Sequence, residues 1–386
     1  MVVLVAFKYE KDLGFAMKNL IEGIEEILLM GPGPSCVPQE VYSALSRPTL
    51  GHLDPYFIKI MDEIKALLQK IMKTKNRFTF PVSGTGSAGM EACLVNLLEK
   101  EDKVLILVNG IFGQRMADIS QRIGARVDTL EFEWGTPVNL DAVRKKLSDN
   151  KYKLVAAVHA ETSTGVRNPV PEIGKLVRES GALFLVDAVT SLGGIPVNVD
   201  DWNIDALYSG TQKCLSCPPG LSPVTFSERA LNVILNRVTK VPNWYLDLSM
   251  IIKYWEGKKR VYHHTAPVNM LYALYQALML IFDEGLANVF ERHRKVHEML
   301  VNGLNRLGLE MLVDKPYRLP MLNAVKIPEK VDDEWFRGEL RNRYKIEIGG
   351  GLGPLNGKIW RIGLMGYTAR EENVEKLLTA FNDLLN

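Results

Sequence analysis

The feature that most constrains the fold is a regular alternation of short apolar runs with helical patterns. Six runs have the composition of buried strands: residues 78–82, 104–108, 127–132, 154–158, 182–186 and 222–226. Apolar residues recur at helical spacing between them, at residues 87–99, 113–123, 140–147 and 173–180. Strands separated by helices in this rhythm predict a largely parallel, doubly wound sheet.

The chain is too long for one ordinary domain. At 386 residues it suggests two domains. Long helical patterns at 270–284 and 287–307 follow the alternation, and the second leads toward the C-terminal region. We therefore expect an α/β fold divided into an N-terminal arm (1–26), a large domain (27–284) and a smaller C-terminal α+β domain (285–386). Helical spacing at residues 15–27 predicts a helix in the arm.

One lysine follows the apolar run 204–208 in a tight turn, Ser209-Gly210-Thr211-Gln212-Lys213. The residues after it include two prolines and a glycine, so they cannot continue a helix. Partial burial would lower the pKa of Lys213, because desolvation disfavours the ammonium form. A neutral amine can bond covalently to an aldehyde. Taken singly, however, Lys213 is more simply interpreted as an exposed lysine, as most lysines are.

A carboxylate upstream in the sequence favours a catalytic role for Lys213 over that of an exposed lysine. The apolar residues 183–186 end in Asp187. A carboxylate at the carboxyl end of a parallel strand points into the crevice where open α/β sheets bind ligands. Pyridoxal 5′-phosphate (PLP) requires an amine for its aldehyde and an anion that keeps its ring nitrogen protonated. Lys213 and Asp187 would supply this pair, so we predict a PLP site in which both residues are catalytic.

A phosphate-binding turn is predicted between the first strand and its helix. Residues 84–89 match G-x-G-x-x-G, but a dinucleotide site also needs an acidic residue at the end of the next strand, which instead ends Val108-Asn109-Gly110. A phosphate at the helix N-terminus remains favoured, because free N–H groups and the helix dipole attract it. Thr85, Gly86 and Ser87 are therefore candidate phosphate ligands. For one of the hydroxyls, an ordinary helix N-cap is the alternative.

Several motifs together resemble the alanine–glyoxylate / serine–pyruvate aminotransferases, which are class V aminotransferases and fold-type-I PLP enzymes. The resemblance begins at residue 28 and extends nearly to the C-terminus. It implies a large domain with a mostly parallel mixed sheet and a smaller C-terminal α+β domain. The motifs are Gly31-Pro32-Gly33-Pro34, Ser83-Gly84-Thr85-Gly86, Ser163-Thr164-Gly165-Val166, Val186-Asp187-Ala188-Val189, Gln212-Lys213, Tyr262-His263-His264-Thr265 and Gly350-Gly351-Leu352-Gly353-Pro354.

The resemblance implies roles for four further residues. Gln212 would assist phosphate binding, and the Thr162 hydroxyl would lie near the ring oxygen of PLP. Phe112 stands where most relatives have a tryptophan stacked on the ring, and its smaller π face predicts reduced cofactor affinity. Arg361 would bind the substrate α-carboxylate through a bidentate ion pair. The alternative for Phe112 is a plain core aromatic. Without the resemblance, Arg361 is equally well interpreted as a strand-edge arginine.

The resemblance also implies a homodimer with shared active sites. Tyr262 and Thr265 would contact the PLP phosphate of the other subunit. Gly51, His52 and Leu53 would enter the partner's substrate pocket, and the N-terminal arm would wrap around the partner. Without the resemblance, residues 262–265 are better interpreted as a surface loop with two hydrogen-bonded histidines.

The expected activity is transfer of an amino group from a small amino acid (alanine or serine) to a 2-oxo acid such as glyoxylate or pyruvate. The alternative on the same fold is a PLP-dependent lyase of the cysteine desulfurase type, which needs a nucleophilic cysteine on a mobile loop. A non-enzymatic binding role is a third interpretation, and it is weakened by the presence of every group that PLP requires.

Composition narrows the partners further. The formal net charge of +2 gives no indication of nucleic acid or of an anionic membrane. Four cysteines in a chain of this length indicate reduced thiols, and the C-x-x-C at Cys214 and Cys217 lacks a second pair for zinc. We therefore expect no metal, no membrane span and a cytoplasmic protein.

Overall fold

A seven-stranded mixed sheet forms the centre of the computed structural model, which describes residues 19–257 and 259–385. The strand order is β2-β10-β9-β8-β5-β3-β4. β10 pairs antiparallel with β2 and β9, and the other pairings are parallel, which confirms the predicted sheet. The strands are β2 (Phe78–Ser83), β3 (Lys103–Val108), β4 (Arg126–Glu131), β5 (Leu154–Val158), β8 (Leu183–Asp187), β9 (Ala206–Tyr208) and β10 (Leu221–Phe226).

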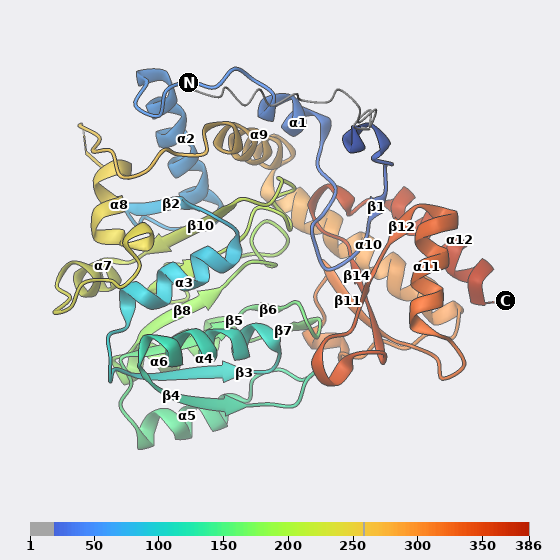
Figure 1. Cartoon of the computed structure of the whole chain (residues 1–386). Helices are drawn as coiled ribbons and strands as arrows, with labels where there is room; N and C mark the ends of the chain where they lie inside the picture. Colours follow the sequence, from blue (N-terminus) through green and yellow to red (C-terminus); the bar gives the residue numbers. More distant parts are fainter. Residues whose placement is uncertain (1–18, 258, 386) are drawn as a thin grey trace, which may run out of the picture.

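Helices connect these strands and cover both faces of the sheet (Figure 1). α4 and α6 end at Gly124 and Gly181, which have φ values of 87° and 84° and adopt the left-handed C-cap conformation. Asp54 precedes α2 as its N-cap, and its carboxylate accepts hydrogen bonds from the N–H groups of Tyr56 and Phe57. The helices are α1 (Gln39–Leu45), α2 (Pro55–Ile71), α3 (Gly86–Leu97), α4 (Ile111–Ile123), α5 (Leu140–Asp149), α6 (Val170–Ser180), α7 (Glu228–Leu235), α8 (Leu248–Trp255) and α9 (Val268–Glu284).

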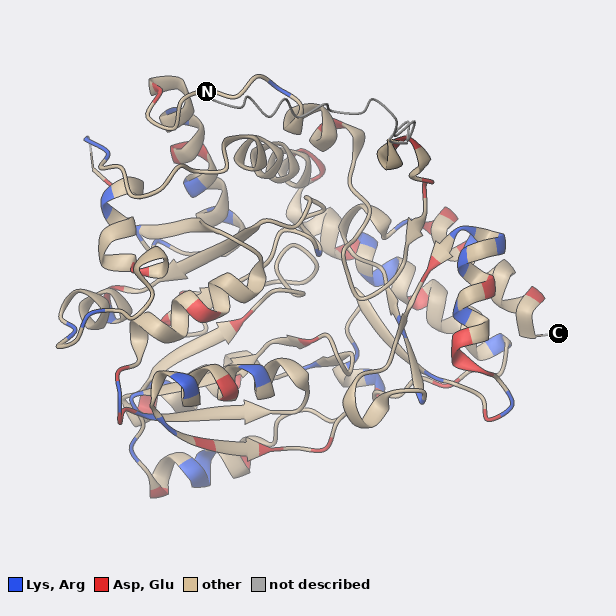
Figure 2. Ribbon diagram, in the orientation of Figure 1, with Lys and Arg blue, Asp and Glu red and all other residues tan. Residues whose placement is uncertain are grey.

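Burial follows from this layering. Every residue of β5, β8, β9 and β10 is buried, as expected for strands that are covered on both faces. β4 lies at the sheet edge and is half exposed. Charged residues follow the same layering. Figure 2 shows that the central strands carry few charged residues, whereas the outer helices carry both acidic and basic ones.

The C-terminal region contains a second, smaller sheet with the order β11-β14-β13. Its own hydrophobic cluster is built around Trp360, whose ring stacks on Phe336 at a centroid distance of 4.3 Å. β1 (Leu28–Leu29) pairs with β12 (Ile346–Glu347). The chain therefore contacts the C-terminal region before it enters the large sheet. The other elements are α10 (Leu286–Arg306), β11 (Leu322–Lys326), α11 (Asp333–Tyr344), β13 (Gly349–Gly350), β14 (Ile359–Gly363) and α12 (Glu371–Leu385).

The helix predicted over residues 15–27 is wrong for its described part, and residues 15–18 lie outside the described residues. Only Leu20–Gly23 form a helical turn, which is of the 3-10 type. Leu20, Ile21 and Ile24 are 80%, 74% and 74% exposed, so their apolar side chains have no core to pack against. Short helices depend on such packing, and periodic spacing without it does not produce one.

Within the described ranges, no single helix is long and apolar enough to cross a membrane. α9 and α10 meet the length and composition criteria only when taken together, and the chain bends by 83° at the break between them.

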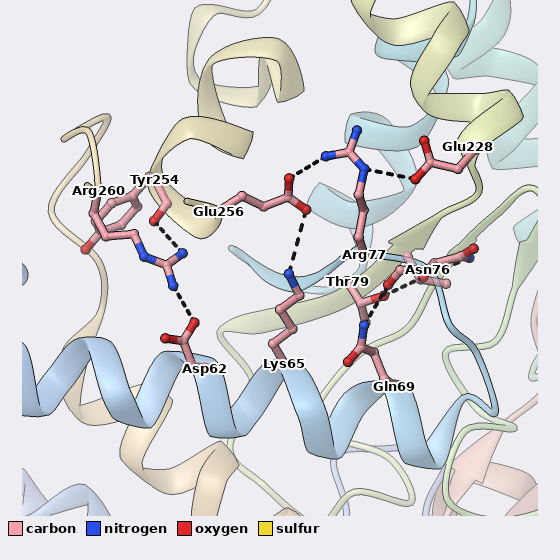
Figure 3. Close-up of polar contacts among 11 residues, drawn as sticks. Asp62, Lys65, Gln69, Asn76, Arg77, Thr79, Glu228, Tyr254, Glu256 and Arg260 are labelled. Atoms are coloured by element: carbon pink, nitrogen blue, oxygen red, sulfur yellow. Dashed lines mark hydrogen bonds and ion pairs between the residues drawn. The ribbon is translucent and has the colours of Figure 1, made fainter. Parts of the chain in front are cut away.

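Ion pairs fix the stretch that follows α8. The Arg260 side chain is 7% exposed and pairs with Asp62 on α2, and it also donates to the Tyr254 carbonyl. This network holds the chain that leads to Tyr262 and Thr265 against α2. The ion pairs drawn in Figure 3 are Arg77–Glu228, Arg77–Glu256, Lys65–Glu256 and Arg260–Asp62.

Candidate active site

The two predicted catalytic residues lie at the same edge of the central sheet. Asp187 ends β8, and the turn that contains Lys213 follows β9, which runs parallel to β8. The carboxyl ends of parallel strands meet at one edge, so the fold brings the two residues together. Each is close enough to shift the pKa of the other electrostatically.

Lys213 is buried beneath the glycine–proline loop. It is 9% exposed, and its Nζ donates to the Pro32 carbonyl. Gly33 has φ +108°, and a Cβ there would overlap the lysine side chain, so only glycine fits. Burial lowers the pKa of Lys213 to about 8, and the nearby Arg361 acts in the same direction. A substantial fraction of the amine is therefore neutral near physiological pH.

Asp187 is buried and accepts hydrogen bonds from two donors. Its Oδ1 accepts from the Val189 N–H at 2.8 Å, and its Oδ2 accepts from the Tyr208 hydroxyl at 2.6 Å. Burial raises the pKa of Asp187 to about 6, while Tyr208, Val189 and Lys213 act in the opposite direction. The carboxylate form thus depends on these neighbours.

The predicted phosphate turn lies against both catalytic turns. Thr85 precedes α3 and makes no side-chain capping bond, so the N-cap alternative does not apply to it. A Cβ at Gly86 would stand 3.2 Å from Val189 Cγ2 and 3.5 Å from the Ser209 carbonyl oxygen. This close approach points the N-terminus of α3 at the lysine turn. The Ser87 Oγ contacts Arg115 Nη1 at 3.3 Å.

Three further predicted residues surround this space. Phe112 is half-buried at the start of α4, and the Arg115 guanidinium lies 5.0 Å from its ring centroid. The hydroxyl of Thr162 is buried and lies 2.6 Å from that of Thr190. Gln212 has a buried Oε1 with no hydrogen-bond partner among the described residues.

Arg361 enters the site from the C-terminal region. It is 7% exposed on β14, its Nε donates to the Gly350 carbonyl at 2.7 Å, and its Nη1 lies 3.4 Å from the Thr162 carbonyl. Burial lowers its pKa to about 10, although Glu161 opposes this shift. No salt bridge joins it to any residue in 19–257 or 259–385. A buried cation without an ion pair favours an anionic ligand.

The remaining predicted residues form a separate surface cluster. The rings of His52 and Tyr262 lie 5.0 Å apart, and the Tyr262 hydroxyl lies 3.4 Å from Thr265 Oγ1. Gly51, Leu53, Tyr262 and Thr265 are exposed. Within the described part of the chain, no hydrogen bond or ring contact joins this cluster to Lys213 or Asp187. Within the described residues, this cluster therefore makes no direct contact with the two catalytic residues, although the neighbouring His264 ring lies 2.8 Å from Ser83 Oγ beside the phosphate turn.

Two buried groups at the site were not identified from the sequence. Tyr208 donates to Asp187, and Glu161 accepts from the Ser163 hydroxyl at 2.6 Å. Burial raises the pKa of Glu161 to about 7. Tyr208 is the last apolar residue before the lysine turn, and that position is the only signal the sequence offers for it.

The cysteines argue against the lyase alternative. Cys93, Cys214 and Cys217 are buried, and burial raises the pKa of their thiols, to about 12 for Cys214 and Cys217. Thiols of this kind are poor nucleophiles. Cys36 is half-buried, and its Sγ accepts from the Leu29 N–H at 3.3 Å. Among the described residues, no group of three or more His, Cys, Asp or Glu side chains could hold a metal ion.

The edge of a mostly parallel sheet thus brings together a buried amine, a buried carboxylate, a helix N-terminus and a buried arginine that forms no ion pair with any described residue. This arrangement on this fold defines a fold-type-I PLP-dependent transferase. The Aminotransferase class-V family model matches residues 29–377. The chain belongs to the class-V aminotransferase family.

Named relatives agree with this assignment. The (S)-ureidoglycine–glyoxylate transaminase of Bacillus subtilis is 41% identical over 375 residues, covering 92% of this chain and 90% of the relative. The alanine–glyoxylate aminotransferase of Callithrix jacchus is 42% identical over 361 residues, covering 93% and 87%. The crystal structure of an alanine–glyoxylate aminotransferase from Nostoc sp. superposes with a TM-score of 0.92 at 49% identity, covering 94% of this chain and 96% of that one. The chain is an aminotransferase.

Proposed function

We propose that this enzyme uses PLP to move an amino group from alanine or serine to a 2-oxo acid, with glyoxylate or pyruvate as acceptor. The observation that supports the proposal best is the buried Lys213 amine, whose pKa is lowered by burial and is also affected electrostatically by Asp187 and Arg361. Relatives that are named for glyoxylate support that acceptor.

The described residues fit PLP. Thr85, Gly86, Ser87 and Gln212 would hold its phosphate, Phe112 would lie against its ring, and Thr162 would face the ring oxygen. PLP supplies an electron sink for the charge that develops when the substrate loses its α-proton. Lys213 would bond to the aldehyde and, once released, act as base and then acid for that proton. Asp187 would keep the ring nitrogen protonated.

The lowered pKa of Lys213 predicts how cofactor capture depends on pH. Only the neutral amine attacks the aldehyde, so below the lysine pKa the rate constant for PLP binding to cofactor-free protein should rise by about tenfold per pH unit. The rise should level off near pH 8, because the pKa of Lys213 is about 8. Stopped-flow absorbance across pH 6 to 10 measures this profile. A rate that keeps climbing to pH 10 would show that Lys213 has the pKa of an exposed lysine.

Arg361→Gln should impair substrate binding while leaving the cofactor in place. The variant lacks the bidentate partner for an α-carboxylate, and kcat/KM for alanine should fall by about hundredfold, mostly through KM. The matched test substrate is ethylamine, which lacks the carboxylate. Ethylamine should react slowly with the enzyme, and its rate constant should be the same in the variant and in the wild type. Equal losses for alanine and ethylamine would assign Arg361 a structural role instead.

We further propose a cytoplasmic homodimer in which Tyr262, Thr265, Gly51, His52 and Leu53 complete the partner's site. The exposure of Gly51, Leu53, Tyr262 and Thr265 and the absence of a described contact with Lys213 support this. Exposed aromatic side chains in the same region, Tyr56, Trp244 and Tyr245, supply apolar surface for such an interface. Sedimentation equilibrium should give twice the 43.4 kDa chain mass, whereas a monomer with full activity would refute shared sites.

The activity itself is tested by a panel of amino donors. Alanine, serine and larger amino acids are each assayed against glyoxylate and pyruvate, and the 2-oxo product is quantified. Alanine or serine with glyoxylate should give the highest kcat/KM. Exclusive use of a ureido-bearing donor would instead place the enzyme with the Bacillus subtilis relative.

A further inference from the structure

We propose that Tyr208 is a positioning residue of the aminotransferase site, which acts through Asp187 to keep the cofactor ring nitrogen protonated. This inference rests on the proposed PLP chemistry and extends it to a fully buried residue. It assigns a function to a tyrosine that the strand pattern identifies only as a core residue.

The fold places the two side chains together by strand register. β8 and β9 are parallel, and Asp187 pairs directly with Tyr208. The Ala188 N–H donates to the Tyr208 carbonyl at 2.9 Å, which fixes the two strand ends to one another. Side chains at paired positions lie on the same face of the sheet. The Tyr208 hydroxyl therefore reaches Asp187 Oδ2 at 2.6 Å, the short distance expected when a hydroxyl donates to a carboxylate.

Burial makes this contact consequential. Tyr208 is 0% exposed and Asp187 is 3% exposed, so water cannot replace a lost donor. The charged and titratable groups around the carboxylate are Lys213 after β9, Arg115 on α4, Cys93 on α3 and Glu161 before α6. Of these, the two cations favour the ionised carboxylate, and Glu161 opposes it. Tyr208 is the largest of the opposing influences that lower the pKa of Asp187 against burial.

The competing interpretation is that Tyr208 is a core aromatic whose hydroxyl merely needs a partner. In that case its hydroxyl would affect folding stability and nothing else, because the ring supplies the packing. The chain offers a matched control for this possibility. Tyr152, just before β5, donates to Oδ2 of Asp128 on the edge strand β4 at 2.5 Å, which is the same kind of tyrosine-to-aspartate hydrogen bond.

The experiment compares Tyr208→Phe, Tyr152→Phe and the wild type, each loaded with PLP labelled with ¹⁵N at the ring nitrogen. We expect the ¹⁵N shift of Tyr208→Phe to move toward the unprotonated value at a lower pH than in the wild type. Its dissociation constant for PLP should rise by about tenfold, because an Asp187 carboxylate without this donor is ionised less readily and pairs more weakly with the protonated ring nitrogen. Tyr152→Phe should match the wild type in both measurements, whatever its melting temperature.

A second variant tests the opposite direction without removing the hydroxyl. Incorporation of 3-fluorotyrosine at position 208 makes the hydroxyl a stronger donor, and the ring nitrogen should then stay protonated to a higher pH than in the wild type. Identical ¹⁵N titrations and PLP affinities in the wild type, Tyr208→Phe and the fluorinated protein would overturn the inference. A wild-type protein that does not bind PLP would instead overturn the proposed function.

Discussion

Replacement of Lys213 with alanine is expected to abolish transamination and to lower turnover by about 10⁴-fold or more, since both covalent and acid–base catalysis are lost. Lys213 supplies the only buried amine that the described structure places beside Asp187. Glu161 is a weaker base, with a pKa of about 7, and accepts a hydrogen bond from Ser163. It therefore cannot replace Lys213 as the base. Turnover of alanine with glyoxylate measures the loss.

Controls separate this loss from misfolding. The variant should bind PLP without a covalent bond, because Thr85, Gly86, Ser87 and Asp187 are unchanged, and its thermal unfolding should remain cooperative. Added methylamine should restore part of the activity, because a small free amine can enter the space that the side chain vacates. Lys213→Arg retains a cation but not a neutral amine, and it should be equally inactive. Near-normal turnover in either variant would contradict the assignment.

Local patterns in the sequence were sufficient for the central sheet. Apolar runs predicted its buried central strands, because strands buried on both faces must be continuously apolar. The half-exposed edge strand β4 was predicted although its residues are not continuously apolar. The lysine turn and the carboxylate after residues 183–186 were likewise predictable, since strand ends and turn residues are local features. The class V resemblance was confirmed by the family match. The division into domains at residues 26 and 284 remains a prediction.

The rest depended on non-local contacts. The bond between Tyr208 and Asp187 exists because β8 and β9 are adjacent and in a particular register, and no pattern within either strand specifies its neighbour. The placement of Pro32 over Lys213 joins residues that are far apart in the chain. The helix expected at 15–27 failed for the converse reason. Leu20, Ile21 and Ile24 follow helical spacing, but within the described residues their side chains are largely exposed and do not pack against a core.

These contacts also explain how one site balances two opposing electrostatic requirements. Burial lowers the pKa of Lys213, which favours the neutral amine. Burial also raises the pKa of Asp187, which favours the neutral carboxylic acid over the carboxylate. In a more solvent-exposed site Asp187 would stay ionised, but Lys213 would stay protonated as well. Donors to Asp187 resolve the conflict, because Tyr208 and Val189 stabilise the carboxylate without affecting the amine directly.

Asp187→Asn should retain the fold and lose most of the activity, with kcat about 10³-fold lower through loss of charge stabilisation in the transition state. The amide has the same shape, and its oxygen can still accept from Val189 or Tyr208, so the melting temperature should change little. It cannot keep the ring nitrogen protonated, and the electron sink is weakened. PLP methylated at the ring nitrogen bears a permanent positive charge, and it should recover much of the activity in Asp187→Asn but not in Lys213→Ala. Unchanged kinetics in Asp187→Asn, or no gain from the methylated cofactor, would show that the carboxylate acts in some way other than through the ring.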